Sequence, residues 1–217
     1  MLYLIFFQFF FDLFKILLYF CTLITYLNIL IETLKNIATI KTGVFAKPYS
    51  EGEIAYLQAK HFNKYYQLTT PTHSFLKDYT VSDKHLLMQG DVLFAAKGTK
   101  NFAARYKYNI QPAVASTSFF VIRLNDGVQN KILPEFLAWY INQPISQRFL
   151  KVRARGTSMV SISKAALQEL EIPIPNIKTQ QTVLKITHLG ITENELTRKI
   201  SILREKQIQQ KIINAIK

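Results

Sequence analysis

The sequence predicts an α+β protein in which a β-rich domain with mixed sheets is followed by a long C-terminal helix. Short runs of β-branched and aromatic residues between turn residues are typical of strands, and 113–124 is the clearest of them. Apolar residues at helical spacing follow over 133–150. The tail from Lys178 contains no proline and repeats apolar residues at seven-residue spacing, which is typical of a helix that packs on another helix.

The chain before the tail divides into short elements. We expect an amphipathic turn or strand start over 32–42, a strand at 53–59, and further short segments at 65–68 and 75–81. A strand at 92–96 precedes the long strand at 113–124, and Asp126-Gly127 forms the turn after it. The helix over 133–150 has Pro134 in its first turn and is broken by Pro144. A short helix follows at 165–170, and the prolines of 172–175 exclude that extended segment from the middle of a sheet.

The predicted C-terminal helix runs from 193 to 216, about 36 Å at 1.5 Å per residue. Thr192 and Glu195 have the spacing of a capping box at its start, and Gly190 allows a break before it. Its apolar stripe changes phase between residues 203 and 208. The stripe consists of Leu189, Leu196, Ile200, Leu203, Ile208, Ile212 and Ile216. Such a helix either pairs with a partner helix or folds back on its own domain.

The first 31 residues have a different composition from the rest of the chain. Residues 16–31 carry no formal charge but are short for a membrane span, and a longer span would include Asp12 and Lys15. Three interpretations stay open: a membrane anchor, an amphipathic or buried helix, or a stretch translated upstream of the functional start or left from a disrupted longer gene. No basic segment and cleavage site of a secretory signal is present.

The charge of the chain points to a polyanionic partner. The net charge is +13, and the segment 97–155 alone holds ten Lys or Arg against two acids, a net +8. Nucleic acid and an anionic membrane surface both fit such a charge. A bias of codon usage toward Lys would explain the total, but it explains the clustering less well. The single cysteine, Cys21, excludes an internal disulfide framework and fits a reducing compartment.

The segment 87–99 joins a turn at Gln89-Gly90-Asp91 to an apolar strand and a glycine loop flanked by lysines. Such a loop can present ammonium groups and backbone amides to phosphate, whereas Gly90-Asp91 is interpreted as a turn that positions the strand. A second glycine and hydroxyl turn follows the basic residues at 151–155. The residues predicted to contact a polyanion such as nucleic acid are Lys97, Lys100, Asn101, Arg105, Lys107, Lys151, Arg153, Arg155, Thr157 and Ser158.

Several segments, taken in order, resemble the target-recognition domain of type I restriction-modification specificity subunits. They are IATIKTG at 37–43, GDVLFAAKGT at 90–99, ASTSFFVIR at 115–123, LAWYIN at 137–142, GTS at 156–158, and IPIP at 172–175 followed by Gln180. The resemblance covers about residues 32–217. It divides the chain into a hydrophobic segment at 1–31, a DNA target-recognition domain at 32–177, and a helical spacer or dimerisation region at 178–217.

The resemblance implies a subunit without catalytic activity of its own. Members of the family read double-stranded DNA and direct a methyltransferase subunit and a restriction subunit to the target. S-adenosylmethionine, ATP and Mg²⁺ would belong to those partner subunits, so no cofactor is expected in this chain. Full-length members carry two recognition domains separated by helices that pair in an antiparallel coiled coil. The single domain here suggests a half-subunit that pairs with a second copy as a homodimer, in the cytoplasm.

Other function classes fit the sequence less well. A nuclease needs clustered carboxylates, and the acids here are few and dispersed. A methyltransferase needs a glycine-rich cofactor loop and a catalytic motif, and the sequence shows neither. The four histidines are scattered and predict no metal site. The alternative is a membrane-anchored basic protein, which rests on residues 1–31 as a transmembrane helix.

Overall fold

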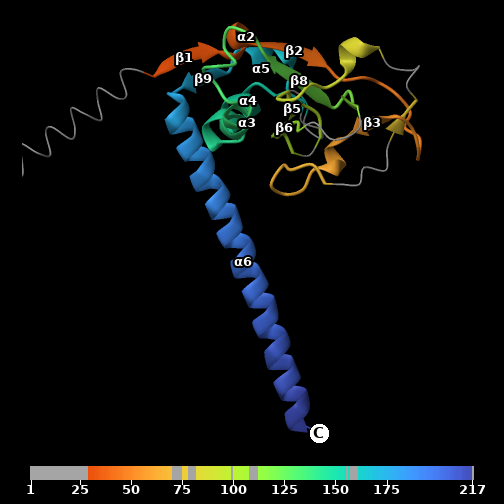
Figure 1. Cartoon of the computed structure of the whole chain (residues 1–217), viewed down its shortest axis with the longest axis vertical. Helices are drawn as coiled ribbons and strands as arrows, with labels where there is room; N and C mark the ends of the chain where they lie inside the picture. The colour runs from red at the N-terminus through yellow and green to blue at the C-terminus, as the bar shows by residue number, and fades with distance from the viewer. Residues whose placement is uncertain are drawn as a thin grey trace, which may run out of the picture.

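The computed structural model describes residues 29–69, 75–77, 82–98, 100–107, 112–154, 156 and 161–216. In the described residues, three small sheets and four short α-helices form a domain, and one long helix leaves it (Figure 1). The elements are β1 (Leu30–Thr33), α2 (Leu34–Ile37), β2 (Ala38–Thr42), β3 (Ile54–Leu57), β4 (Phe75–Leu76), β5 (Val92–Ala95), β6 (Ala103–Arg105), β7 (Ala113–Ala115), β8 (Phe119–Leu124), α3 (Pro134–Ile141), α4 (Pro144–Val152), α5 (Lys164–Gln168), β9 (Glu171–Ile174) and α6 (Ile177–Ile216).

The largest sheet has the order β2-β8-β5-β6, and all its pairs are antiparallel. Strand β5 is buried on both faces, which explains its continuous apolar sequence. Val92 and Phe94 belong to a core shared with α3, α4 and α5, whereas Leu93 and Ala95 belong to a second core shared with β3 and β7. The central strand is therefore fixed by two cores, and the loop that follows it starts from a rigid base.

The predicted long strand at 113–124 is wrong, because the chain turns at Ser116–Ser118. Strand β7 pairs in parallel with β3 in the three-stranded sheet, whereas β8 pairs with β2 and β5. The Phe119 amide donates to the Ser116 carbonyl at 2.9 Å, and the Ser116 and Ser118 hydroxyls lie 2.7 Å apart. The turn thus passes the chain from one sheet to another.

Gly43 lies where the two sheets approach each other. A Cβ atom at this position would lie 2.1 Å from the Ser116 carbonyl oxygen and 2.5 Å from that of Ala115. Because both obstacles are backbone atoms, no larger residue fits without separating the sheets.

The remaining sheet pairs β1 with β9, two segments far apart in the sequence. Pro173 lies opposite Ile31 in this two-stranded sheet, in keeping with the prediction that 172–175 cannot occupy the middle of a sheet. Leu30 and Ile31, assigned from composition to the hydrophobic N-terminal segment, are part of strand β1. Residues 1–28 of that segment lie outside the described residues. Among the described residues, no helix is both long and apolar enough to cross a membrane.

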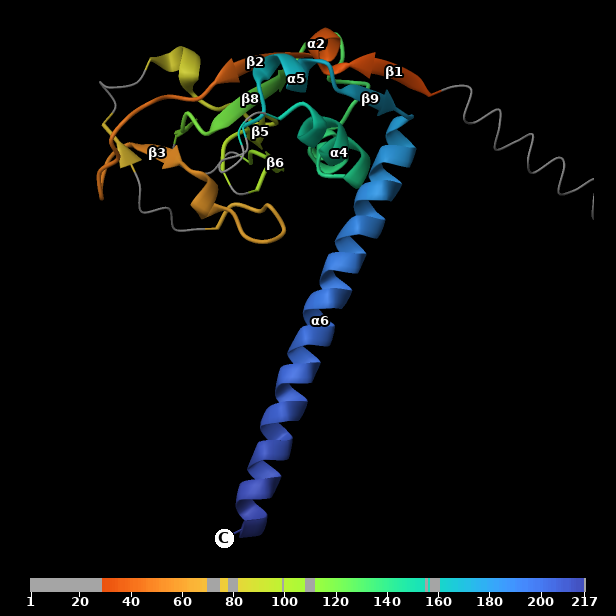
Figure 2. The ribbon, with the colours of Figure 1, turned by 180° about the vertical axis from the view of Figure 1, so that it is seen from behind.

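The prediction that Pro144 breaks the helix over 133–150 is confirmed. Each of the resulting helices has proline in its first turn, where the missing amide hydrogen costs no hydrogen bond. Figure 2 shows α4 beside the first turns of α6 and the rest of α6 running away from the domain.

Helix α6 is longer than predicted. It is one continuous helix of 40 residues, about 60 Å long. Gly190 does not break it, and Thr192 is no helix cap, because its hydroxyl donates to the His188 carbonyl at 3.0 Å inside the helix. The cap is Asn176, whose side-chain oxygen accepts the Thr179 amide hydrogen at 2.9 Å.

Gln180 attaches α6 to the domain. Its side chain is fully buried; its oxygen accepts the Leu133 amide hydrogen at 2.8 Å, and its nitrogen donates to the Lys131 and Pro175 carbonyls at 2.7 Å each. One side chain therefore joins the loop before α3, the end of β9 and the start of α6.

Candidate nucleic-acid interface

The β5–β6 hairpin presents its connecting loop to solvent. Lys97 and Lys100 are exposed, and Gly98 has φ of 135°, a conformation that L residues rarely adopt. Asn101 closes the loop by donating its side-chain amide to the Ala95 carbonyl at 2.9 Å. Lys97 and Lys100 are thus both open to solvent, and the Asn101 side chain is bonded to the last residue of β5.

The structure brings the start of this glycine loop next to Ser161 and Ile162, which follow the second glycine turn in the sequence. Lys97 forms an isolated antiparallel bridge with Ser161, and the Ile162 amide donates to the Ala96 carbonyl at 2.9 Å. Two stretches some sixty residues apart in the sequence thus lie side by side. Arg155, Thr157 and Ser158 lie outside the described residues.

Two further predicted residues lie at the C-terminal end of α4, shortly before that segment. Lys151 is exposed. Arg153 is 41% exposed; its guanidinium carbon lies 3.7 Å from the centroid of the Phe149 ring, and its Nε lies 3.4 Å from a carboxylate oxygen of Glu169. An exposed pair of this kind holds the guanidinium loosely and leaves it able to exchange partners.

Arg105 and Lys107 are not beside the glycine loop. Val92 pairs with Arg105, so Arg105 lies at the opposite end of the hairpin from Lys97. The Arg105 side chain is 21% exposed and forms an ion pair with Glu135 of α3. Lys107 is exposed and lines a cavity of 420 Å³ with Phe62, Tyr66 and Arg105. The predicted DNA-contacting residues therefore fall into two groups, one at each end of the hairpin.

A tight loop at 63–67 is a feature that the sequence did not reveal. The Asn63 side-chain oxygen accepts the amide hydrogens of Tyr65 at 2.8 Å and Gln67 at 3.0 Å. Tyr66 has φ of 60° and stacks on Phe102 with ring centroids 5.0 Å apart. Asn63 with nearby aromatic residues is the only signal in the sequence, and the stacking partner lies 36 positions away.

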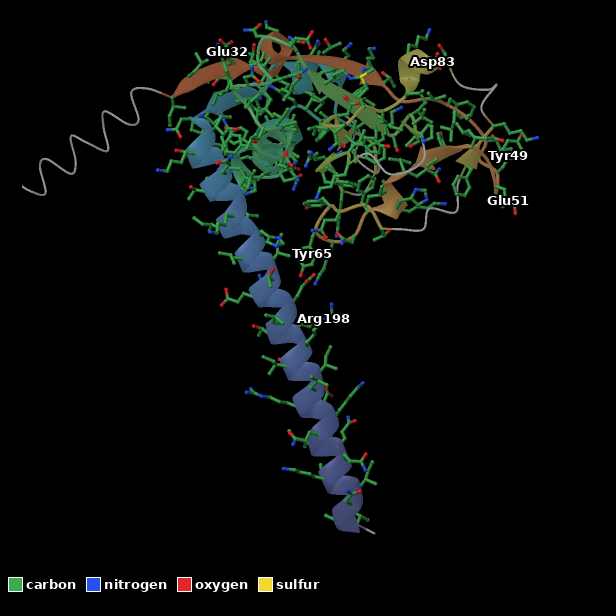
Figure 3. All side chains as sticks on the ribbon, in the orientation of Figure 1. Glu32, Tyr49, Glu51, Tyr65, Asp83 and Arg198 are labelled. Carbon is green, nitrogen blue, oxygen red and sulfur yellow. The ribbon has the colours of Figure 1, made fainter. Side chains whose placement is uncertain are left out.

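This loop faces α6 across a cleft. The cleft has a volume of 470 Å³ and is lined by the loop, β6, α3 and the first turns of α6. Figure 3 shows Tyr65 on the side of the domain that faces α6, and Tyr49 and Glu51 at the far end. Trp139 lines the cleft and is half-buried against Phe136, with ring centroids 5.5 Å apart, so it belongs partly to the core. The α6 residues that line the cleft are Leu184, Thr187, His188 and Ile191.

The Gly90-Asp91 turn is scaffold, as predicted. Asp91 is buried and accepts two hydrogen bonds of 2.7 Å from the Arg123 guanidinium and one of 2.8 Å from the Met88 amide. The hydrogen bond with Asp91 raises the pKa of Arg123 above its usual value. This pair ties the turn before β5 to strand β8 and leaves Arg123 unavailable to a phosphate.

The family described as the type I restriction modification DNA specificity domain matches residues 26–205 of the chain. No curated protein matches the chain. Several solved structures are similar to it, at identities that establish likeness of fold.

One similar structure is the specificity (S) subunit of a type I restriction-modification system from M. genitalium, with 17% identity and a TM-score of 0.52 over 75% of this chain and 38% of that chain. A second is the HsdS subunit from Thermoanaerobacter tengcongensis, with 19% identity and a TM-score of 0.58 over 78% and 44%. A third comes from work on complex assembly and conformational transition of the type I R-M system, with 14% identity and a TM-score of 0.53 over 84% and 41%.

The chain thus spans less than half the length of each of these relatives. The family match covers both the β-rich domain and more than half of α6. The chain belongs to the type I restriction-modification specificity family and has its DNA specificity domain.

Proposed function

We propose that this chain reads double-stranded DNA and directs a methyltransferase subunit and a restriction subunit to the site that it binds. The observation that carries the proposal is the bridge between Lys97 and Ser161, which joins the exposed Lys97 of the β5–β6 hairpin to residues 161–162 from a distant part of the sequence. The chain itself catalyses nothing, and S-adenosylmethionine, ATP and Mg²⁺ act in the partner subunits.

Two kinds of contact serve this function. Lys97, Lys100 and Lys151 are exposed and supply phosphate contacts, which give affinity that falls steeply with salt. Base reading requires side chains with paired donors or acceptors, and Arg105 and Arg153 have the fork that pairs with guanine. Each arginine now pairs with a carboxylate, so DNA would have to replace Glu135 or Glu169. This exchange disfavours binding at sites where no guanine replaces the carboxylate as the partner of the arginine.

We further propose that the chain acts as a half-subunit whose α6 pairs with α6 of a second copy. Every residue from 192 to 216 is exposed, including the apolar stripe. A homodimer would place two recognition domains at a fixed separation and read two halves of an inverted repeat.

The proposal is tested by the salt dependence of DNA binding. The full chain is bound to a long random-sequence duplex at several salt concentrations. We expect K97A/K100A to lower the slope of log affinity against log salt by about 2, because each lost phosphate contact accounts for a slope of about 0.9.

The matched control is K35A/K164A, which removes the same charge from exposed positions on α2 and α5. This control should leave the slope at its wild-type value. Equal slopes for wild type and K97A/K100A would contradict a role for the glycine loop in phosphate binding. Sequencing the duplexes retained from a randomised pool then identifies the target.

A further inference from the structure

Phe45 is the most exposed of the large hydrophobic side chains in the described part of the chain, with 89% of its surface open to solvent. Exposed apolar residues are common, so exposure alone says little about function. The two neighbours of Phe45, however, are partly buried: Val44 and Ala46 pack against the core formed by β3, β4 and β7. The Phe45 side chain therefore points away from that core, between two residues that belong to it.

The segment that carries Phe45 is fixed to the domain. The Val44 amide donates to the Ala115 carbonyl at 2.8 Å, and the Val44 carbonyl accepts the Tyr56 hydroxyl hydrogen at 2.9 Å. Gly43, directly before, lies too close to the backbone of the neighbouring sheet for any larger residue. An anchored backbone thus presents the exposed ring, which lowers the conformational entropy lost when the ring inserts into a partner.

The sheet register places Phe45 at the same edge of the domain as Lys97. The last residues of β2 and β5 pair with the first residues of β8 from opposite sides. The two strands therefore lie about 10 Å apart, which is two inter-strand spacings, and both run toward the turn at 116–118. Phe45 lies three residues beyond the end of β2, and Lys97 donates its amide to the Ser118 carbonyl at 3.3 Å. Phe45 and the glycine loop thus flank one turn, within reach of the same duplex.

The surroundings of Phe45 are basic. Residues 33–50 contain three lysines and no acid, and Lys41 and Lys47, on either side of Phe45, are both exposed. Tyr49, four residues after Phe45, lies at the end of the domain far from α6, so this surface is separate from the helix (Figure 3). Nucleic acid offers both phosphates for the lysines and stacked aromatic faces for the ring, whereas an apolar protein surface offers only the second.

We propose that Phe45 inserts its ring between two stacked base pairs of the bound duplex, from the minor groove, and kinks the DNA at that step. Apolar wedges of this kind partly unstack one base step and bend the duplex by about 20–90°. Pyrimidine–purine steps unstack most easily, so Phe45 adds a preference for TA, CA or TG at one position of the target without a hydrogen bond to a base. The inference rests on the DNA binding proposed above, and it gives part of the sequence reading to a residue without charge.

Fluorescence of labelled DNA tests the proposal with the full chain. The probe is a duplex of about 30 base pairs recovered from the randomised pool, with 2-aminopurine placed at each position in turn and dyes at both ends. Saturating wild-type protein should raise the 2-aminopurine emission severalfold at one base step and increase energy transfer between the ends, because the step opens and the duplex bends. F45A should abolish both changes and weaken binding at least about fivefold, through the loss of one stacking contact.

Two variants control the measurement. F45W keeps a flat aromatic ring and should retain both signals. I145A removes an apolar side chain that is 68% exposed on α4, and it should behave as wild type. Because the Phe45 ring is exposed, F45A should melt at the wild-type temperature. A second selection from the pool with F45A should lose the pyrimidine–purine preference at that step and keep the other positions.

The outcomes separate this inference from the proposed function. F45A should leave the slope of log affinity against log salt unchanged, because the ring neutralises no phosphate. If the wild type binds with a steep salt slope while F45A gives the same bend and the same 2-aminopurine emission, Phe45 is no wedge, and DNA binding by the lysines stands. If F45A changes only the sedimentation of the chain, the ring contacts a second copy, which equally overturns the inference. A wild-type chain without salt-dependent binding overturns the proposed function and this inference together.

Discussion

Asp91 holds the turn before strand β5 in place through its hydrogen bonds. Its carboxylate is buried and receives all three of its described hydrogen bonds from Arg123 and the Met88 amide. A buried charge is tolerated only when such partners are in place. Arg123 therefore has a structural role, whereas Lys97 and Lys100, beyond the other end of β5, are exposed to solvent.

Asp91→Asn should destabilise the domain by about 2–4 kcal/mol, because it leaves the Arg123 guanidinium partly buried without its counter-charge. Chemical denaturation followed by far-UV circular dichroism gives the change in the free energy of unfolding. Asp126→Asn, in an exposed turn, is the control and should change it by less than about 0.5 kcal/mol. A loss below about 1 kcal/mol for Asp91→Asn would show that the pair contributes little.

At the scale of elements, Gln180 joins α6 to the domain by three hydrogen bonds, and Val183 and Leu184 pack against the core beside it. The residues of α6 after Gln180 that are partly buried are Val183, Leu184, Thr187, Gly190 and Ile191, and every residue from 192 to 216 is exposed. Three hydrogen bonds of the Gln180 side chain thus fix where α6 is attached to the domain.

Gln180→Leu should weaken the attachment of α6 by about 1–3 kcal/mol, because the buried Leu133 amide and two carbonyls lose their partner. Hydrogen exchange should show faster exchange at residues 131–133 and 177–184, with β5 protected as before. Gln181→Leu, at the neighbouring exposed position, should leave all of these rates unchanged. Uniformly faster exchange over the domain would instead indicate that Gln180 supports the whole core.

At the scale of the whole molecule, the chain combines a folded domain with a long helix whose residues 192–216 are all exposed. A helical stretch of 25 exposed residues has only marginal stability in water by itself. If α6 pairs with α6 of a second copy as proposed, this pairing and the ordering of the C-terminal half of α6 should therefore be one coupled event.

We accordingly expect the helical signal at 222 nm and the melting temperature to rise with protein concentration. The variant L196D/L203D should lose this dependence while keeping the spectrum of the folded domain, because it places charges in the seam between copies. R198A/K199A is the control on the same helix and should retain the dependence. A wild-type melting temperature that is independent of concentration would contradict pairing.

Local patterns in the sequence are sufficient to predict an element when its structure depends mainly on its own residues. The apolar run of β5, the proline break between α3 and α4, and the existence of a C-terminal helix follow from periodicity and from proline chemistry alone. The family resemblance is confirmed by the match over residues 26–205.

The remaining features depend on contacts between distant residues. The turn at Ser116–Ser118 interrupts an apolar run because β7 and β8 belong to different sheets, and no local pattern records that. The ion pair of Arg105 with Glu135 and the stacking of Tyr66 on Phe102 join residues 30 and 36 positions apart. The start of α6 was misplaced because its true cap, Asn176, follows directly on the IPIP segment. Which of the predicted residues contact DNA stays a prediction.

The buried amide of Gln180 also has a mechanical consequence. It makes the junction a clamp, and α6 beyond it is a lever arm of about 54 Å. A tilt of about one degree at the clamp moves Ile216 by about 1 Å, the scale on which side chains lose contact. Small changes of packing around Lys131 and Pro175 would therefore be magnified at the far tip, so the stiffness of this one joint sets how accurately the domain is held relative to the far end of α6.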